Sequence, residues 1–149
     1  MDNRDQLDSA VSIRPSTPAD KTALIAGRDI ESRRFLGEGA TEPNPAFCIL
    51  VSGEIVGWVD FDFDTDRTWL LPGEVNIGYN VFPPHRSRRY ATSAVRLVFD
   101  HLAANTEHTV ATLLINLDND TSLRVAKRLG CQRQSDLDDN AYFKTQLTQ

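Results

Sequence analysis

The hydrophobic residues of the chain follow two different periods, and each period predicts a different kind of element. In residues 74–81 hydrophobic residues alternate with polar or small ones, which is typical of a strand. In residues 91–102 they recur three and four positions apart, which is typical of an amphipathic helix. The expected elements, in chain order, are a strand at 11–15, a helix from about 19 to 36, strands at 46–51, 54–63 and 74–81, a helix at 91–103, a strand at 109–117, a helix at 118–130, and short strands at 131–134 and 140–147.

Capping and turn residues mark the ends of several of these elements. Thr17-Pro18 suits the N-cap and first position of the first helix, which we expect to be interrupted near Gly27. Ser52-Gly53 stands between two apolar runs and indicates a β-hairpin. Asp118 or Asn119 is expected to cap the last helix, because both residue types accept hydrogen bonds from free backbone N–H groups.

The order of these elements, β-α-(α)-β-β-β-α-β-α-β-β, predicts an α/β fold with a mixed sheet and helices on both of its faces. A chain of 149 residues, 40% hydrophobic and 25% charged, is long enough for one domain with a real core. We expect residues 1–10 to form a flexible N-terminal tail and residues 11–149 a single domain. The Gly- and Pro-rich segment 37–46 is expected to be a loop, either a plain connector or a cover over a substrate site.

The charge and composition narrow the classes of partner. A net charge of −5 argues against a general nucleic-acid binder, which would need an excess of Lys and Arg, and suits a cationic partner slightly better. The N-terminus does not resemble a signal peptide, and no apolar run approaches the roughly 18–20 residues of a membrane span. We therefore predict a cytoplasmic protein with no membrane partner. Cys48, Cys131 and the three histidines show no metal-binding spacing, so no metal site is expected.

The segment Pro84–Thr92, PHRSRRYAT, joins a predicted strand to a predicted helix and carries three arginines. The first N–H groups of a helix are unpaired, and together with the helix dipole they attract an anion. Positive side chains at that end of a helix are unfavourable unless an anion offsets them, so Arg86, Arg88 and Arg89 indicate a phosphate-bearing ligand. The alternative is a solvated basic loop whose arginines point outward.

A second helix cap, Asn119–Ser122, follows the next predicted strand. If the two strands are parallel neighbours, both helices begin at the same edge of the sheet, which is where open α/β sheets bind their ligands. One ligand could then place its phosphates on the first helix and its reactive end near the second.

In these features the chain resembles the GNAT N-acetyltransferase superfamily, which transfers acetyl from acetyl-CoA to amines. Within it, the chain looks most like the branch that includes ribosomal-protein N-terminal acetyltransferases. The resemblance implies a mostly antiparallel sheet with two parallel, splayed central strands, and acetyl-CoA as co-substrate. It rests on VSIRPSTPADKTALI (residues 11–25), GEIVGWVDFDF (53–63), NIGYNVFPPHRSRRYATSAVRLV (76–98) and NLDNDTSLRVAKRLGC (116–131).

The resemblance also implies which residues hold the cofactor. The family's pyrophosphate loop reads Gln/Arg-x-x-Gly-x-Gly/Ala, and Arg86 and Ala91 match its first and last positions. Arg89 stands where the family has its middle glycine, so its side chain could crowd the pyrophosphate or clamp it instead. The cofactor-binding residues implied in this way are Val81, Phe82, Arg86, Ser87, Arg88, Arg89, Tyr90, Ala91, Thr92, Asn119 and Ser122.

Catalytic roles follow from the same resemblance. Ser122 matches a serine that can protonate the leaving thiolate, whereas the tyrosine of other branches is replaced by Ala126. Glu74 is the leading base for deprotonating the amine, although relatives often carry their glutamate where Asn76 stands. The alternative for Glu74 is an exposed glutamate at the start of a strand. Asp60 and Asp62 are held in reserve as the base. The residues expected to bind the amine acceptor are Asp60 and Asn76.

Two functions remain open at this point. The first is an active enzyme in which a primary amine, from a protein N-terminus or a small cationic molecule, attacks acetyl-CoA directly. The second is a catalytically impaired GNAT-fold module for binding or regulation, with weak or no CoA binding. Arg89, Asn76 and Ala126 all favour the second function. The resemblance also leaves a homodimer open.

Overall fold

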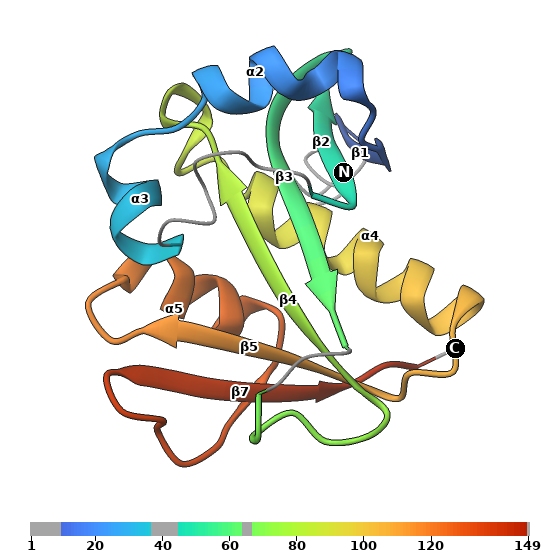
Figure 1. The fold of residues 1–149 in the computed structure, drawn as a ribbon, viewed down its shortest axis with the longest axis vertical. Helices are drawn as coiled ribbons and strands as arrows, with labels where there is room; N and C mark the ends of the chain where they lie inside the picture. Colours follow the sequence, from blue (N-terminus) through green and yellow to red (C-terminus); the bar gives the residue numbers. More distant parts are fainter. Residues whose placement is uncertain (1–9, 37–44, 64–66, 149) are drawn as a thin grey trace, which may run out of the picture. The chain divides into compact units, whose positions relative to one another are not determined.

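A computed structural model of the chain describes residues 10–36, 45–63 and 67–148. The predicted tail, apart from Ala10, and most of the predicted loop at 37–46 lie outside these residues. The strands form a mixed seven-stranded sheet in the order β1-β2-β3-β4-β5-β7-β6 (Figure 1), which confirms the predicted fold class. The elements are β1 (Val11–Pro15), η1 (Pro18–Asp20), α2 (Lys21–Ala26), α3 (Ile30–Leu36), β2 (Phe47–Val51), β3 (Glu54–Asp62), β4 (Glu74–Val81), η3 (Pro83–His85), α4 (Tyr90–Asn105), β5 (Val110–Asn116), α5 (Asp120–Arg128), β6 (Gln132–Arg133) and β7 (Asn140–Gln146).

The chain divides into two compact units. The first takes in the described parts of Met1–Asp60 together with Tyr79–Val95, and the second takes in those of Phe61–Gly78 together with Arg96–Gln149. The expectation of a single domain over residues 11–149 stays a prediction.

In the first unit, β1, β2 and β3 form an antiparallel meander. Val51 pairs with Glu54 across the turn, and Ser52 and Gly53 both have positive φ angles, +51° and +80°. Positive φ at both central residues of a two-residue turn matches the right-handed twist of the strands, so the predicted hairpin is confirmed. In the next strand, a Cβ atom at Gly57 would lie 2.2 Å from the carbonyl oxygen of Asn80, so only glycine fits there.

The predicted interruption of the first helix near Gly27 is also confirmed, because α2 ends at Ala26 and α3 begins at Ile30. A Cβ atom at Gly27 would lie 2.3 Å from the ring of Phe82. The glycine therefore lets the linker between the two helices pack directly on that ring.

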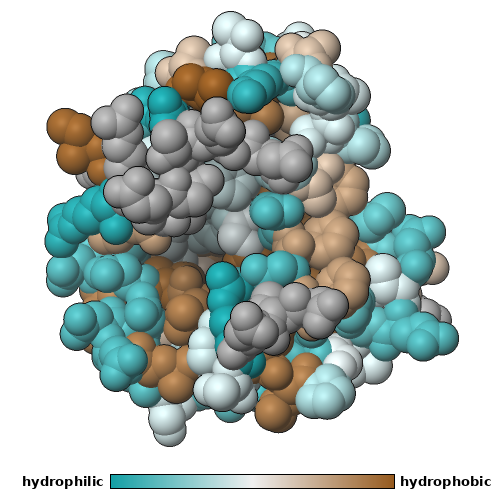
Figure 2. Space-filling view, viewed as in Figure 1, coloured by the Kyte–Doolittle hydropathy of each residue, from teal (hydrophilic) through white to brown (hydrophobic). Residues whose placement is uncertain are grey.

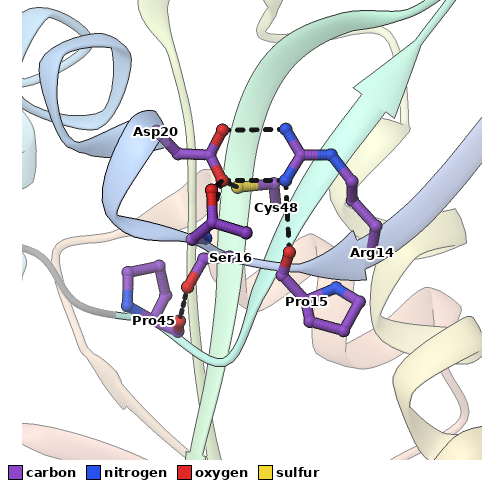
Figure 3. Close-up of polar contacts among 7 residues, drawn as sticks. Arg14, Pro15, Ser16, Asp20, Pro45 and Cys48 are labelled. Atoms are coloured by element: carbon purple, nitrogen blue, oxygen red, sulfur yellow. Dashed lines mark hydrogen bonds and ion pairs between the residues drawn. The ribbon is translucent and has the colours of Figure 1, made fainter.

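A buried carboxylate joins β1 to the first helical turn (Figure 3). Arg14 donates two hydrogen bonds of 2.8 Å to the two carboxylate oxygens of Asp20, whose Oδ2 also accepts from the backbone N–H of Thr17. The thiol of Cys48 lies 3.6 Å from Oδ2 and is fully buried. These contacts hold the pKa of Asp20 well below its usual range, chiefly through Arg14, whereas burial raises the pKa of Cys48 to about 11.

In the second unit, β4 and β5 are parallel and β5 and β7 are antiparallel. The parallel ladder pairs Glu74–Asn76 with Val110–Thr112, which confirms the prediction of two parallel central strands. Both faces of β5 are covered, since its consecutive residues Ala111, Thr112 and Leu113 are all buried. The short pair β6–β7 ends the sheet as predicted.

Among the coloured residues in Figure 2, hydrophobic residues form several groups that are interspersed with hydrophilic ones. The large hydrophobic side chains most exposed in the described ranges are Ile30, Phe63, Leu71 and Leu117. None of the helices in those ranges is both long enough and apolar enough to cross a bilayer.

Candidate functional site

The turn expected to bind an anion lies in the first unit, together with the end of the strand before it and the start of the helix after it. β4 ends at Val81, a short 3₁₀ turn covers Pro83–His85, and α4 begins at Tyr90. The backbone N–H of Phe82 donates a 2.8 Å hydrogen bond to the carbonyl of Val56, and Val81 and Phe82 are both buried. The start of the turn is therefore fixed to the sheet, and the predicted location of the turn is confirmed.

Two residues of the turn have left-handed backbones. Ser87 has a φ of +64° and Arg89 a φ of +63°, and both side chains are exposed. A residue other than glycine in this conformation costs roughly 1 kcal/mol. The position at which the resemblance expects glycine therefore keeps the backbone shape that favours glycine, although arginine occupies it. The side chain of Arg89 is exposed. The conformation of the turn therefore does not show whether this side chain crowds a phosphate or clamps it.

The first turn of α4 contains a buried hydroxyl group. The Oγ1 atom of Thr92 is inaccessible and has no hydrogen-bond partner among the residues that the structure describes. Buried polar groups are nearly always paired, so an orphan of this kind calls for an explanation. It lies at the N-terminus of a helix of 16 residues, where free N–H groups and the helix dipole favour an anion. The free N–H groups fit a ligand that accepts hydrogen bonds, and the hydroxyl of Thr92 could join them only after the atoms that cover it move aside.

Arg86 is engaged within the protein. Its Nε donates to the carbonyl of Val81 at 2.7 Å, and its two terminal nitrogens donate to the carboxylate of Asp29 at 2.7 and 3.1 Å. A fourth bond, of 3.2 Å, reaches Oδ1 of Asn80. This pairing lowers the pKa of Asp29 to about 2. Contact between the Arg86 side chain and a phosphate stays a prediction, and the guanidinium has few donors left for it.

In the second unit, Asn119 rather than Asp118 caps α5. Its Oδ1 accepts a 3.3 Å hydrogen bond from the backbone N–H of Ser122, and its carbonyl accepts the N–H of Leu123. Val125 and Ala126 are buried on the inner side of this helix. Ser122 is half-buried in the first turn, and its role as a proton donor stays a prediction.

Glu74, the predicted base, is buried rather than exposed, so the alternative of an exposed strand-start glutamate is wrong. Its Oε2 lies 2.6 Å from Nζ of Lys144, and its Oε1 accepts a 3.0 Å hydrogen bond from the backbone N–H of Leu71. The hydrogen bond to Glu74 raises the pKa of Lys144, which is therefore charged at neutral pH. The ring of Tyr142 lies 5.5 Å from the same Nζ.

Asn76 faces the same side of the sheet as Glu74, as predicted. Its Oδ1 accepts a 3.0 Å hydrogen bond from the hydroxyl of Thr112, a fully buried residue of β5. Thr112 in turn pairs with Lys144 across β5 and β7. The second unit therefore contains a polar cluster of Glu74, Asn76, Thr112 and Lys144.

The two aspartates held in reserve as the base, Asp60 and Asp62, have partners inside the protein. Asp60 accepts a 3.0 Å hydrogen bond from the backbone N–H of Ala46. Asp62 forms an ion pair with Arg67, 2.9 Å long, in which both side chains are substantially exposed. A role for either one as the base, and for Asp60 in binding the acceptor, stays a prediction.

Sequence reasoning missed Asp29, Thr112 and Lys144. The alternation in residues 140–147 places Lys144 on the same face of a strand as Tyr142. This pattern could have indicated that Lys144 belongs to a polar cluster on that face. No local pattern in the sequence could have paired Asp29 with Arg86, because 57 positions separate the two residues. Within the described ranges, no three His, Cys, Asp or Glu side chains are grouped so that they could hold a metal ion.

Comparison with solved structures identifies relatives of this fold. The aminoglycoside acetyltransferase AAC(6')-Ib, in complex with paromomycin and acetyl-CoA, superposes with a TM-score of 0.74 at 18% identity, over 92% of this chain and 93% of that one. RimL, the ribosomal L7/L12 α-N-protein acetyltransferase in complex with CoA, gives a TM-score of 0.76 at 12% identity, over 93% and 95%. RimJ of Mycobacterium smegmatis, with CoA-disulfide, gives 0.72 at 17% identity, over 91% and 81%.

A sequence comparison with curated proteins gave no match. The family model of the acetyltransferase (GNAT) domain, by contrast, matches residues 7–132, which is most of the chain and includes the turn, the polar cluster except Lys144, and the capped helix α5. The match agrees with the strand order and the parallel central pair. The chain therefore belongs to the GNAT acetyltransferase family.

Proposed function

We propose that this protein transfers the acetyl group of acetyl-CoA to a primary amine by direct attack. The observation that carries the proposal is the turn from Val81 to Thr92. It leads from a buried strand end into a long helix, keeps left-handed backbone at position 89, and leaves the buried hydroxyl of Thr92 without a partner among the described residues. Membership in the GNAT acetyltransferase family supports the proposal.

In this proposal the pyrophosphate of acetyl-CoA binds at the turn. The backbone N–H groups at the start of α4 and the hydroxyl of Thr92 donate hydrogen bonds to it. The exposed arginines Arg88 and Arg89 add positive charge close to the same helix end. The family resemblance implies that Val81 and Phe82, at the end of β4, contact the pantetheine arm, and it implies Asn119 as a further contact. Backbone pairing with the arm falls to Val81, because the backbone of Phe82 already donates to Val56 and accepts from His85.

The chemistry requires a neutral amine and a protonated leaving group. An ammonium group first gives a proton to a base, for which we propose Glu74. The free amine then attacks the thioester carbonyl carbon, so a C–N bond forms and the C–S bond breaks. The CoA thiolate leaves with the C–S electron pair, and we propose that it takes the proton of Ser122. The nitrogen, which still carries one extra proton, passes that proton to the serine oxygen, so the amide and the CoA thiol form and the serine is restored.

The acceptor is a primary amine of a peptide or of a small cationic molecule. RimL and AAC(6')-Ib, two structural neighbours, act on a ribosomal protein and bind an aminoglycoside respectively. The net charge of −5 favours a cationic acceptor. We propose Asp60 and Asn76 as acceptor contacts.

One observation favours the second candidate, a binding or regulatory module. The carboxylate of Glu74 already accepts hydrogen bonds from Lys144 and from the backbone of Leu71. Each of its oxygens therefore already accepts one hydrogen bond, and Oε2 is paired with the positive charge of Lys144, which opposes the approach of a second cation such as an ammonium group. Such a module would retain the fold but turn over no acceptor.

Calorimetry with acetyl-CoA, followed by an assay of thiol release with peptide N-termini, polyamines and aminoglycosides, tests the proposal. We expect binding, and turnover with one acceptor class. Binding without turnover across the panel would support the module, and no binding at all would overturn the proposal. The matched variant is Thr92→Val, which removes a hydroxyl but almost no volume. It should weaken acetyl-CoA binding about tenfold, as expected for a hydrogen bond to a charged group, whereas Thr22→Val on exposed α2 should not.

A further inference from the structure

The linker between α2 and α3 is attached to the anion-binding turn at two points in the first unit. Gly27 packs on the ring of Phe82 so closely that a Cβ atom would not fit. Asp29 binds the guanidinium of Arg86 through both of its oxygens. Only about a quarter of each of these two side chains is exposed, 26% for Asp29 and 24% for Arg86.

Each end of this ion pair is itself fixed to a different element. On one side, Oδ1 of Asp29 accepts the backbone N–H of Ser32 at 2.9 Å, and the hydroxyl of Ser32 accepts the backbone N–H of Asp29 at the same distance. On the other side, Arg86 donates to the end of β4 through Val81 and Asn80. The pair therefore connects the start of α3 to the end of β4.

A guanidinium in this arrangement is poorly placed to serve a phosphate as well. Its four bonds use most of its donors, and two of them go to a carboxylate whose charge offsets its own. Turning it toward a ligand would leave the partly buried carboxylate of Asp29 without its counter-charge, which is costly.

We propose that Arg86 is a positioning residue rather than a phosphate ligand. Because Asp29 holds it, Arg86 fixes the path of the turn before Ser87. When acetyl-CoA binds and orders the turn, the ion pair also orders residues 27–36. The inference rests on the proposed function for the identity of the ligand. It implies that a change at Asp29, far from the turn in sequence, alters binding at the turn.

Asp29→Asn separates the positioning role from a direct contact, and Arg86→Lys tests the same ion pair from its other side. Asp29→Asn keeps a good helix cap, because asparagine caps as well as aspartate, but it removes the ion pair. Arg86→Lys keeps the positive charge but loses the two-pronged geometry. The control is Ser32→Ala, which weakens the cap and leaves Asp29 and Arg86 in place.

The measurements are acetyl-CoA affinity by calorimetry and hydrogen exchange of the amides of residues 27–36 with and without acetyl-CoA. For the wild type we expect acetyl-CoA to slow this exchange. Asp29→Asn and Arg86→Lys should each weaken binding about tenfold, within the usual range of coupling between sites, and abolish the slowing. Ser32→Ala should preserve both.

If Arg86 instead contacted the phosphate directly, Asp29→Asn should have the opposite effect on acetyl-CoA affinity. Asp29→Asn would then free Arg86 for the ligand, so unchanged or tighter binding of acetyl-CoA would overturn the proposal. If the wild type bound no acetyl-CoA, the proposed function would be the part that fails. The link itself is then judged without ligand: faster exchange of residues 27–36 in Arg86→Lys than in the wild type supports it, and equal exchange overturns it.

Discussion

The Nζ atom of Lys144 lies 2.6 Å from Oε2 of Glu74, and the glutamate side chain is 7% exposed. Glu74 is the first residue of β4 and Lys144 belongs to β7, on the far side of β5. The lysine therefore reaches across one strand to provide the counter-charge of a buried carboxylate. Lys144 has two possible effects, on the stability of the second unit and on the reactivity of Glu74, and they can be measured separately.

Replacement of Lys144 by methionine should destabilise the protein. We expect Lys144→Met to lower the free energy of unfolding at pH 7 by about 2–3 kcal/mol, because it leaves a buried charge unpaired. Urea unfolding measures this loss. The double variant Glu74→Gln/Lys144→Met should regain part of it, since removing both charges avoids the unpaired one.

The loss of stability in Lys144→Met should depend on pH in a direction that the pKa of Lys144 determines. The folded state raises the pKa of Lys144 through its hydrogen bond to Glu74, so its contribution is complete below the unfolded pKa of about 10.4 and is lost as the pH rises through the folded value. The gap in unfolding free energy between wild type and Lys144→Met should therefore narrow above that pH. A gap that stays constant would contradict a protonated lysine in the pair.

Glu74→Gln tests the catalytic role of the carboxylate. If Glu74 is the base, acetyl transfer should fall about 100-fold or more in kcat/KM, the usual contribution of a general base. Acetyl-CoA affinity, measured by calorimetry, should stay the same because the turn lies elsewhere in the chain. An equal loss of affinity and rate would instead point to a disturbed fold, and no loss of rate would assign the proton transfer to another group.

Features that depend on neighbouring residues could be predicted from the sequence. The hairpin at Ser52-Gly53, the interruption near Gly27 and the cap at Asn119 each follow from the backbone needs of a few adjacent residues. The element order left the parallel pairing of β4 and β5 as a condition, and the family resemblance implied it.

The partners of the charged residues could not be predicted in this way. Glu74 and Lys144 lie 70 positions apart, and Asp29 and Arg86 lie 57 apart, so no local pattern links them. The charge of a residue also does not show which partner it contacts. Three arginines in one turn suggested three similar phosphate contacts, yet Arg86 is held by Asp29 while Arg88 and Arg89 are exposed. Which arginine is already neutralised depends on the tertiary structure.

Arg89→Gly should stabilise the protein. Arg89 has a φ of +63°, a conformation that glycine adopts without strain, so we expect a gain of about 0.5–1 kcal/mol in the free energy of unfolding. Arg88→Gly is the matched control, because Arg88 is not among the described residues with positive φ. There the added freedom of the unfolded chain should produce a loss of similar size.

Arg89→Gly also tests what the arginine does for the ligand. With its guanidinium exposed near the start of α4, we expect weaker acetyl-CoA binding that depends less on salt, since one screened attraction is removed. Tighter binding would instead show that the side chain crowds the pyrophosphate. Calorimetry at two salt concentrations distinguishes these results.

Asn119→Ala should remove the cap of α5. The side chain of Asn119 accepts the backbone N–H of Ser122, and loss of an N-cap costs about 1 kcal/mol. Urea unfolding should show this loss, whereas Asn119→Asp should be nearly neutral because aspartate caps equally well. Unchanged stability of the alanine variant would mean that the 3.3 Å bond contributes little.

Asp20→Asn should weaken the first unit in a manner that depends on pH. Arg14 holds the pKa of Asp20 well below its ordinary value, so the stabilisation is present above the unfolded pKa, about 3.9, and is lost as the pH falls toward the folded value. The urea midpoint of the variant should therefore lie below that of the wild type at pH 7, and the gap should be smaller at pH 3. Asp136→Asn is the control, because the ion pair of Asp136 with Arg133 is exposed and should contribute little at either pH. An equal gap for Asp20→Asn at both pH values would mean that the shape of the side chain, and not its charge, holds Arg14 and Thr17 in place.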